Sequence, residues 1–374
     1  MSNKKKCGIV TFHSSHNYGS VLQAYALEKT ISNLGYPAEI IDFRHPTTTK
    51  IYKRCLWSNK NSLRSNIFQF LSIGIFKDGK AYEEGFNNFI EKQLVKSKQI
   101  KNLSDIPTDY DILICGSDQI WNPISSGENH PIYFLNFPGE AKRFSYAASS
   151  GSRPFIDNEN FDIAKILGKY ESIGVREEFM QQYLKNEIGL ESIVNPDPTL
   201  LLTKSDWEKL EKPYHGLPKE YILVYSIIDQ KGACQIAQQV AKDLHLPIVH
   251  IATNETCNFL SHNEFRKIVD YSLTDVTPEQ FVWLFHNARH VVSSSFHGNM
   301  FSLIFEKDFT YHFRNVVDSR ILTIHERAGL GKSRWVKNCD NIKITQKIDY
   351  SRIRPLLEKY RADGIHYILS NIEK

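Results

Sequence analysis

Four short segments of the sequence place hydroxyl, amide, carboxylate, guanidinium or imidazole groups directly after an apolar run. In an open α/β sheet, side chains at that point reach the carboxyl edge of the strands, where ligands bind. The first segment is the polar loop 13–20, in which Asn17 and Ser20 add hydrogen-bonding groups to the free backbone N–H groups of a helix start. This loop favours an anion, and an ordinary capped loop is the alternative interpretation. It is not G-x-G-x-x-G, so the dinucleotide-binding fingerprint is absent.

The second segment, residues 116–123, combines small residues with a carboxylate, an amide and an indole. Such a mixture after a buried strand is typical of the edge of a sugar-binding site. Asp118 can accept a proton from a hydroxyl, as a general base must. The alternative is a turn in which Ser117 and Asp118 cap the backbone.

Two further segments supply a positive charge and an acid–base group. Arg176 ends an apolar run, where its guanidinium fork matches a carboxylate or a phosphate; an ion pair with Glu177 or Glu178 is the alternative. Residues 293–299 place three serines and a histidine between a strand and an apolar helix, which predicts a phosphate cradle at the helix N-terminus. His297 is placed there to donate a proton, or alternatively to cap its own helix. A G-x-S-x-G elbow is absent, so nothing in the sequence supports a serine hydrolase.

The elements that must position these groups alternate between strands and helices. Apolar runs at 7–12 and 38–43 flank a helical period over 21–35, which together predict a right-handed βαβ crossover. The same alternation continues to the end of the chain and defines an α/β protein. Further strands are expected at 111–116, 143–149, 171–176, 221–227, 247–252 and 290–295, and further helices at 177–187, 232–245, 277–288, 297–306 and 350–370.

A break near residue 200 divides the alternation into two series of similar size. The chain has 374 residues, too many for one ordinary core. We therefore expect two Rossmann-like domains that face a cleft, an N-terminal one of residues 1–202 and a C-terminal one of residues 203–345. An amphipathic helix within 346–374 is expected to pack back across their junction.

The composition excludes several classes of protein. Hydrophobic residues make up 41% and charged residues 24%, which excludes a disordered chain, a collagen-like repeat and a coiled coil. The net charge of +4 gives no argument for nucleic acid but suits an enzyme that handles anionic small molecules. No secretory signal and no run of eighteen apolar residues is found, so we expect a soluble cytoplasmic protein. Six cysteines without a C-x-x-C pair predict reduced, mostly buried thiols and no metal cluster: Cys7, Cys55, Cys115, Cys234, Cys257 and Cys339.

The segment 43–77 departs from this balance, because it holds seven basic residues, interleaved aromatic residues and no acidic residue. A solvated loop and helix with unpaired lysines is one interpretation. The other is a surface that attracts anionic lipid, with aromatic side chains such as Trp57 buried at the interface.

Together, these segments resemble the polysaccharide pyruvyl transferase family. The matching motifs are TFHSSHNYGSVLQAYAL (11–27), DILICGSDQIWNP (111–123), FSYAASSG (144–151), GVREEF (174–179), NPDPTLLL (195–202) and SSSFHGNMFSLIF (293–305). The resemblance implies the two-domain architecture of B-type glycosyltransferases (GT-B), with the active site between the Rossmann-like halves. It also implies transfer of pyruvate from phosphoenolpyruvate (PEP) onto sugar hydroxyls as a cyclic ketal, on bacterial capsule, exopolysaccharide or secondary cell-wall precursors.

The resemblance also implies roles for particular residues. Some members carry arginine and leucine where Ser295 and Phe296 stand here, so one anionic contact is expected to be replaced or lost. His297 is expected as the acid and Asp118 or His16 as the base, without a metal or cofactor. The residues implied to bind PEP are Arg176, Ser295, Phe296, His297, Gly298, Asn299 and Arg320, and those implied to bind the acceptor are Asn17, Tyr18, Gly19, Ser117, Gln119 and Trp121.

The implied partners are PEP and a sugar or polyprenyl-diphosphate-linked oligosaccharide. The N-terminal domain would then be the acceptor side and the C-terminal domain the PEP side, with segment 43–77 beside the acceptor mouth at the cytoplasmic face of the inner membrane. Two other functions remain open at this point. One is a GT-B glycosyltransferase that holds a nucleotide-sugar diphosphate at the helix start near His297. The other is a non-catalytic sugar-binding protein that kept the fold.

Overall fold

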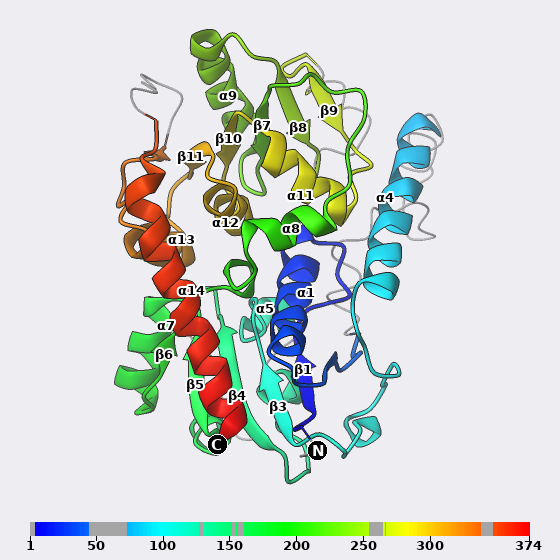
Figure 1. The fold of residues 1–374 in the computed structure, drawn as a ribbon, viewed down its shortest axis with the longest axis vertical. Coiled ribbons are helices and arrows are strands. Elements are labelled where there is room, and N and C mark those ends of the chain that lie inside the picture. Colours follow the sequence, from blue (N-terminus) through cyan, green and yellow to red (C-terminus); the bar gives the residue numbers. More distant parts are fainter. Residues whose placement is uncertain are drawn as a thin grey trace.

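Two parallel six-stranded sheets form the framework of the protein, one above the other in Figure 1. The computed structural model describes residues 4–44, 73–126, 130–151, 155, 161–253, 265, 267–337 and 347–374. The first sheet has the strand order β2-β1-β3-β4-β5-β6 and the second has the order β12-β11-β10-β7-β8-β9.

The strands of the two sheets follow each other along the chain. The first sheet consists of β1 (Cys7–Val10), β2 (Ala38–Ile40), β3 (Ile112–Cys115), β4 (Lys142–Ala148), β5 (Ser172–Val175) and β6 (Ile193–Val194). The second consists of β7 (Ile222–Tyr225), β8 (Ile248–Ile251), β9 (Tyr271–Leu273), β10 (His290–Ser293), β11 (Asp308–His312) and β12 (Trp335–Val336).

Helices connect these strands. They are α1 (Tyr18–Asn33), α4 (Ile73–Lys92), α5 (Pro123–Ser126), α6 (Ile163–Leu167), α7 (Glu178–Tyr183), α8 (Lys204–Leu210), α9 (Gln230–Leu244), α11 (Pro278–Asn287), α12 (Phe296–Ile304), α13 (Ser319–Arg327) and α14 (Tyr350–Glu373). The α/β class and the expected strands and helices are confirmed, with boundaries that shift by a few residues. α1 begins three residues early because the Asn17 side chain accepts a hydrogen bond from Ser20 N and caps it.

The strand order places one ligand-binding crevice in each sheet. β1 lies between β2 and β3, and β7 lies between β8 and β10, so the chain direction across the sheet reverses at these points. Loops that leave neighbouring strands there diverge, and a crevice opens at the carboxyl edge. The first crevice is bordered by the loops after β1 and β3, and the second by the loops after β7 and β10.

A shared hydrophobic core joins the two sheets, since one cluster of buried residues contains side chains of β3, β7, α11 and α12. Tyr18 of α1 stacks on Phe281 of α11 with 4.4 Å between ring centroids. Its hydroxyl donates to Val276 O at 2.9 Å. The start of α1 is therefore fixed against the second sheet's helices.

The C-terminal helix α14 lies along both halves of the molecule (Figure 1). Near its start, the Tyr350 hydroxyl donates to Ser302 O at 3.3 Å. Near its end, the Tyr367 hydroxyl donates to Ser145 O of β4 at 3.0 Å. The domain boundaries at 202/203 and 345/346 stay predictions.

Part of the sequence-based interpretation falls outside the described residues. Of the basic segment 43–77, residues 45–72, with Trp57, are not described, and neither are Cys55, Cys257 and Cys339. Cys7, Cys115 and Cys234 are buried free thiols. Within the described ranges, no helix is long and apolar enough to cross a membrane, and no cluster of three or more metal-ligating side chains is found.

Candidate active site

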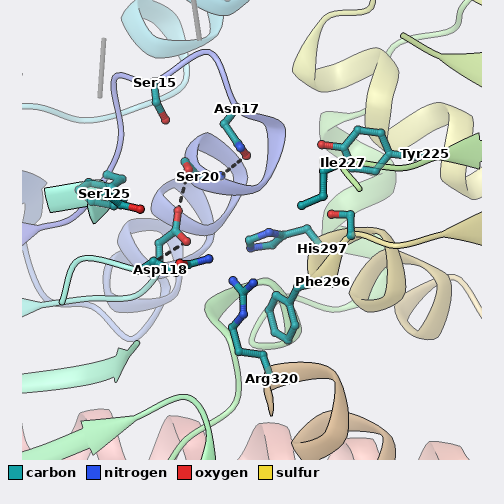
Figure 2. A pocket seen from close by; sticks show the side chains of 13 residues that line it. Ser15, Asn17, Ser20, Asp118, Ser125, Tyr225, Ile227, Phe296, His297 and Arg320 are labelled. Carbon is teal, nitrogen blue, oxygen red and sulfur yellow. Dashed lines mark hydrogen bonds between the residues drawn. The ribbon is translucent and has the colours of Figure 1, made fainter. Parts of the chain in front are cut away.

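The crevices of the two sheets open into a single cleft (Figure 2). Its first wall comes from the loops after β1 and β3 and from the starts of α1 and α5, and its second wall from the ends of β7 and β10 and from α12 and α13. The residues that line it are Phe12, Ser15, Asn17, Ser20, Asp118, Gln119, Ser125, Tyr225, Ile227, Ser295, Phe296, His297 and Arg320.

Asp118 faces the cleft from the loop after β3, in the left-handed backbone region with φ of 66°. Its Oδ2 accepts a hydrogen bond from Ser20 Oγ at 2.6 Å, and its Oδ1 accepts from Gln119 N at 2.8 Å. Burial alone would raise the pKa of this carboxyl, but the charges of Arg176 and His297 and these hydrogen bonds bring the pKa below its usual value. Asp118 is therefore an ionised carboxylate. The bond from Gln119 N is the backbone cap of the alternative interpretation. Asp118 therefore both caps the turn and faces the cleft.

Arg176 directly follows β5, and its guanidinium group lies near Asp118 and Phe296. Its Nη1 donates to Asp197 Oδ2 at 2.9 Å, and its Nη2 lies 3.5 Å from Asp118 Oδ1. The guanidinium carbon is 4.8 Å from the centroid of the Phe296 ring, within the range of a cation–π contact. The carboxylates paired with Arg176 are thus Asp118 and Asp197, whereas the alternative read from the sequence named the adjacent glutamates. Its side chain is 1% exposed, and among the described residues Nε and Nη2 find no hydrogen-bond acceptor.

His297 stands in the first turn of α12 with its ring toward the cleft (Figure 2). The helix cap is Ser295, whose side chain accepts from Gly298 N, so the interpretation of His297 as its own helix cap is wrong. His297 Nε2 lies 3.7 Å from Asp197 Oδ2, which is too long for a hydrogen bond. This nitrogen is buried and has no hydrogen-bond partner in the described part of the chain. It is therefore free to bond with a ligand.

Asp197 is a buried carboxylate to which the sequence analysis gave no role. It lies three residues after β6, in the Asn-Pro-Asp-Pro segment that we interpreted as a break and as part of a family motif, without a role for the carboxylate. Burial would raise its pKa, but contact with His297 and the charge of Arg176 hold the pKa well below its ordinary range. Its position just after a strand at the carboxyl edge was the available signal.

Arg320, from the start of α13, completes the positive part of the cleft. Its Nε donates to Asp318 Oδ1 at 2.9 Å, and its guanidinium carbon is 5.3 Å from the Phe296 ring centroid. The Gln119 side-chain oxygen, turned toward Arg320, accepts from Nη1 at 2.8 Å. Phe296 therefore contacts two guanidinium groups, those of Arg176 and Arg320.

Some residues expected to bind the acceptor lie in the core instead. The Trp121 side chain is fully buried, and its indole N–H donates to Tyr133 O at 3.0 Å. Ser117 is also fully buried, and its hydroxyl donates to Ala147 O at 2.7 Å. Tyr18 uses its hydroxyl in the core contact described above. Because their polar groups bond to the backbone, these three side chains are not presented to a sugar, whereas Asn17 and Gln119 line the cleft.

Three other residues that we expected in the site, His16, Gly298 and Asn299, do not line the cleft. His16 stacks on Phe86 of α4, with Nε2 3.2 Å from Asn87 Oδ1, and does not line the cleft. Asn299 is fully buried; its Nδ2 donates to Ser295 O at 2.8 Å, so it supports the helix start from within. Gly298 packs against the side chain of Ser293.

Several residues that line the cleft were not expected from the sequence, and Ser15 is the most informative of them. Its Oγ is buried and has no partner among the described residues. Ser15 belongs to the same polar loop as Asn17, and Ser125 follows the second motif closely, so proximity to those motifs was the available signal. Ile227 lies two residues after β7, where no polar motif marks the chain.

Comparisons with solved structures define the fold. Over 98% of this chain and 99% of the other, the fold is similar to the UDP-GlcNAc 2-epimerase of Methanocaldococcus jannaschii in complex with UDP-GlcNAc and UDP, with 12% identity and a TM-score of 0.51. A putative UDP-N-acetylglucosamine 2-epimerase from Listeria monocytogenes is similar over 99% and 96%, with 11% identity and a TM-score of 0.50. The expected GT-B architecture, with two parallel sheets, is thus confirmed.

The family model of polysaccharide pyruvyl transferases matches residues 17–311, and the chain belongs to this family. The match begins at Asn17, beside the cleft, and ends within β11. A comparison with curated proteins finds no match.

Proposed function

We propose that this transferase takes pyruvate from PEP and joins it to two hydroxyls of one sugar as a cyclic ketal, with release of phosphate. The observation that carries the proposal is the placement of His297 Nε2 and Arg176 in one buried cluster, each with nitrogen atoms that lack a partner in the described structure. An anionic substrate with a carbon atom that accepts a proton suits both groups, because its charge would bond to Arg176 and its carbon would take the proton of His297 Nε2.

Anion binding is assigned to the floor of the cleft. Arg320 lines the cleft, and the buried Arg176 has two nitrogen atoms, Nε and Nη2, without an acceptor among the described residues. The N-terminus of α12 adds backbone N–H groups and the positive end of the helix dipole. PEP carries a carboxylate and a phosphate, so two arginines and a helix start fit its two charged ends. In this proposal, Arg320 replaces the arginine that some family members carry at the position of Ser295.

The reaction needs an acid first and a base later. His297 gives its Nε2 proton to the methylene carbon of PEP, which leaves a cationic centre at C2. One sugar hydroxyl forms a C–O bond to C2, the bond from C2 to the phosphate oxygen breaks, and a second hydroxyl closes the ring. Of the two hydroxyl protons, one restores the protonated enzyme and the other leaves with phosphate. Fixed charges and positioning supply the rate enhancement in this scheme.

Asp118 suits the later proton transfer despite its lowered pKa. A hydroxyl that has attacked a cationic carbon becomes an oxonium ion, which is far more acidic than a free hydroxyl, so a weak base is sufficient. Before that step, the ionised carboxylate stabilises the cationic centre. Ser15, Asn17 and Ser125 lie on the same wall as Asp118 and supply the hydroxyl and amide groups that a neutral sugar would bond to.

The test is incubation of the purified protein with PEP and a panel of glycosides, followed by mass spectrometry for added pyruvate and an assay for phosphate. We expect ketal formation and phosphate release in equal amounts, without any nucleotide. A parallel incubation with UDP-sugars is the control. Glycosyl transfer from a nucleotide sugar, with PEP unchanged, would replace this proposal by the glycosyltransferase alternative. Binding of glycosides without turnover of either donor would favour a sugar-binding protein.

We also propose a lipid-linked acceptor, with segment 43–77 docking the acceptor side on the membrane surface or on the diphosphate. Each basic residue near an anionic surface contributes roughly 1 kcal/mol of attraction. The test is co-sedimentation with anionic vesicles of the wild type and of a variant in which Lys50, Lys53, Arg54, Lys60 and Arg64 are neutralised. We expect weaker sedimentation and lower activity on a lipid-linked acceptor for the variant. Equal sedimentation and equal activity of the two proteins would favour the alternative interpretation of the segment, a solvated loop and helix.

A further inference from the structure

One oxygen of Asp197 faces both groups on which the proposed function depends. Oδ2 accepts from Arg176 Nη1 at 2.9 Å and lies 3.7 Å from His297 Nε2. The Asp197 side chain is 0% exposed and does not line the cleft. His297 lines the cleft, whereas Arg176, with a side chain 1% exposed, and Asp197 both lie behind the lining residues.

The other oxygen of Asp197 holds the carboxylate in place. Oδ1 accepts from Thr199 N at 3.0 Å and from Thr199 Oγ1 at 2.7 Å. Prolines on both sides, Pro196 and Pro198, fix the backbone φ at those positions. Oδ2 therefore keeps its direction toward Arg176 and His297.

We propose, building on the proposed function, that Asp197 is a positioning residue that couples anion binding at Arg176 to proton donation by His297. Its negative charge attracts Nε2 and so draws the imidazole toward one side of the cleft. The same charge offsets part of the positive charge of Arg176, so Asp197 weakens the binding of an anion. One carboxylate thus lowers affinity and raises turnover.

The charged groups around His297 support these opposite effects of Asp197 on affinity and on turnover. The groups that act on it are Asp197 from the turn after β6, Asp118 from the loop after β3, and Arg176, which pairs with both carboxylates. Arg320, on the neighbouring helix α13, is paired with Asp318. Four carboxyl groups, those of Asp118, Asp197, Asp318 and the buried Glu177, thus surround two guanidinium groups here, so an anionic substrate is best balanced when His297 carries a proton. PEP then binds best to the form of the enzyme that is ready to donate.

The experiment compares Asp197→Asn with Thr199→Val. Asparagine keeps the shape of the side chain and an acceptor oxygen but removes the charge, whereas Thr199→Val removes one hydrogen bond to Asp197 and leaves its charge. For Asp197→Asn we expect PEP to bind roughly fivefold tighter in calorimetry, because an opposing charge near Arg176 is gone. We expect kcat to fall roughly 10- to 100-fold, the loss typical of a misplaced catalytic group. Thr199→Val loosens the carboxylate but keeps its charge, so it should lower kcat less than Asp197→Asn does and should not tighten PEP binding.

A second readout is the direction in which PEP affinity and kcat move relative to each other. Without the neighbouring carboxylate, anion affinity should rise while kcat falls in Asp197→Asn. A merely structural role would lower PEP affinity and kcat together. Parallel losses of the two quantities would overturn the proposal.

Two further measurements keep the proposal distinct from the proposed function. If Asn is not tolerated at position 197, Asp197→Ser removes the charge with a smaller side chain, and the same split is expected. If the wild type does not turn over PEP, the proposed function fails, and calorimetry with inorganic phosphate still tests the effect of Asp197 on anion affinity. Unchanged or weaker phosphate binding by the variant would then contradict the coupling.

Discussion

Gly19 of α1 lies directly against the imidazole of His297, so that a Cβ atom at position 19 would fall 2.0 Å from His297 Nδ1. The two residues belong to different halves of the molecule, each near the start of a helix that follows a strand at the cleft. Only a residue without a side chain leaves room for the ring. The position of His297 is therefore determined by the first sheet's helix as well as by its own.

Gly19→Ala is expected to displace the imidazole and to lower turnover by roughly 100-fold, because a shift of about 1 Å at a catalytic group has that effect. The helix should remain intact, since alanine is favoured over glycine in a helix by about 1 kcal/mol. Turnover and thermal unfolding measured on the same preparation check both points. Turnover close to wild type would show that the reaction does not depend on this position of His297.

Arg176→Ala is expected to weaken PEP binding. Loss of one charge-assisted hydrogen bond costs on the order of 2–3 kcal/mol, which corresponds to roughly 30- to 150-fold in Kd. Isothermal calorimetry with PEP alone measures this without an acceptor. The matched control is Arg327→Ala on the neighbouring surface, where an exposed arginine pairs with Glu178.

We expect the control to bind PEP like the wild type. Arg176→Lys retains a charge for Asp118 and Asp197 and serves as the second variant if the alanine variant does not fold. Unchanged PEP affinity in a folded Arg176 variant would move the anion site elsewhere in the cleft.

His297→Gln separates proton donation from hydrogen bonding. Glutamine keeps an N–H donor but has no transferable proton, and general acid catalysis typically contributes 10²- to 10⁴-fold. We expect turnover to fall by about that factor, while PEP affinity changes far less. Steady-state kinetics and calorimetry measure the two effects. A variant within about threefold of the wild-type rate would place the acid on another residue.

The sequence predicts which loops form the cleft, because the apolar runs show where strands end. The loops 13–20 and 116–123 and the segment 293–299 each follow an apolar run, and parallel strands bring such loops to a common edge. Their convergence in one cleft, with Arg176 beneath it, follows from that rule. Arg320 was included without a spacing argument, and the structure places it in the cleft.

The direction of a side chain was not predictable in the same way. Trp121 follows a strand as a sugar-binding aromatic residue would, but its indole N–H bonds to the backbone of Tyr133, twelve residues later. Asp197 and His297 are brought together only by the packing of the two halves. Contacts of this kind depend on tertiary packing and leave no periodic signal in a single sequence.

Two buried histidines are expected to make the fold sensitive to mild acid. Burial is the main cause that lowers the pKa of His290 and of His325 to about 4. His325 is held neutral between Trp335 Nε1, which donates to its Nδ1 at 2.7 Å, and Asn299 Oδ1, 3.1 Å from its Nε2. The Nε2 of His290 lies 3.0 Å from Thr310 Oγ1.

The fold loses stability in mild acid because the unfolded chain takes up protons that the folded chain does not. In the unfolded state these histidines titrate near pH 6.5, so between about pH 6.5 and 4 the unfolded chain binds protons that the folded chain does not. The free energy of unfolding should therefore fall as the pH drops through this window, by on the order of 3 kcal/mol for each histidine. Further loss below about pH 4 is expected from Asp118 and Asp197, whose pKa values lie below normal in the folded state.

Chemical denaturation at a series of pH values from about 4 to 8 measures this dependence. His290→Gln should flatten the slope between about pH 6.5 and 4, because glutamine does not titrate. His215→Gln, at an exposed histidine, is the control and should keep the wild-type slope. The Asp118 and Asp197 window lies lower and is not affected by either change. Equal stability of the wild type at pH 7 and pH 4.5 would contradict this prediction. It would mean that the buried histidines accept protons in the folded state, so that His325 is not held neutral by its hydrogen bonds with Trp335 and Asn299.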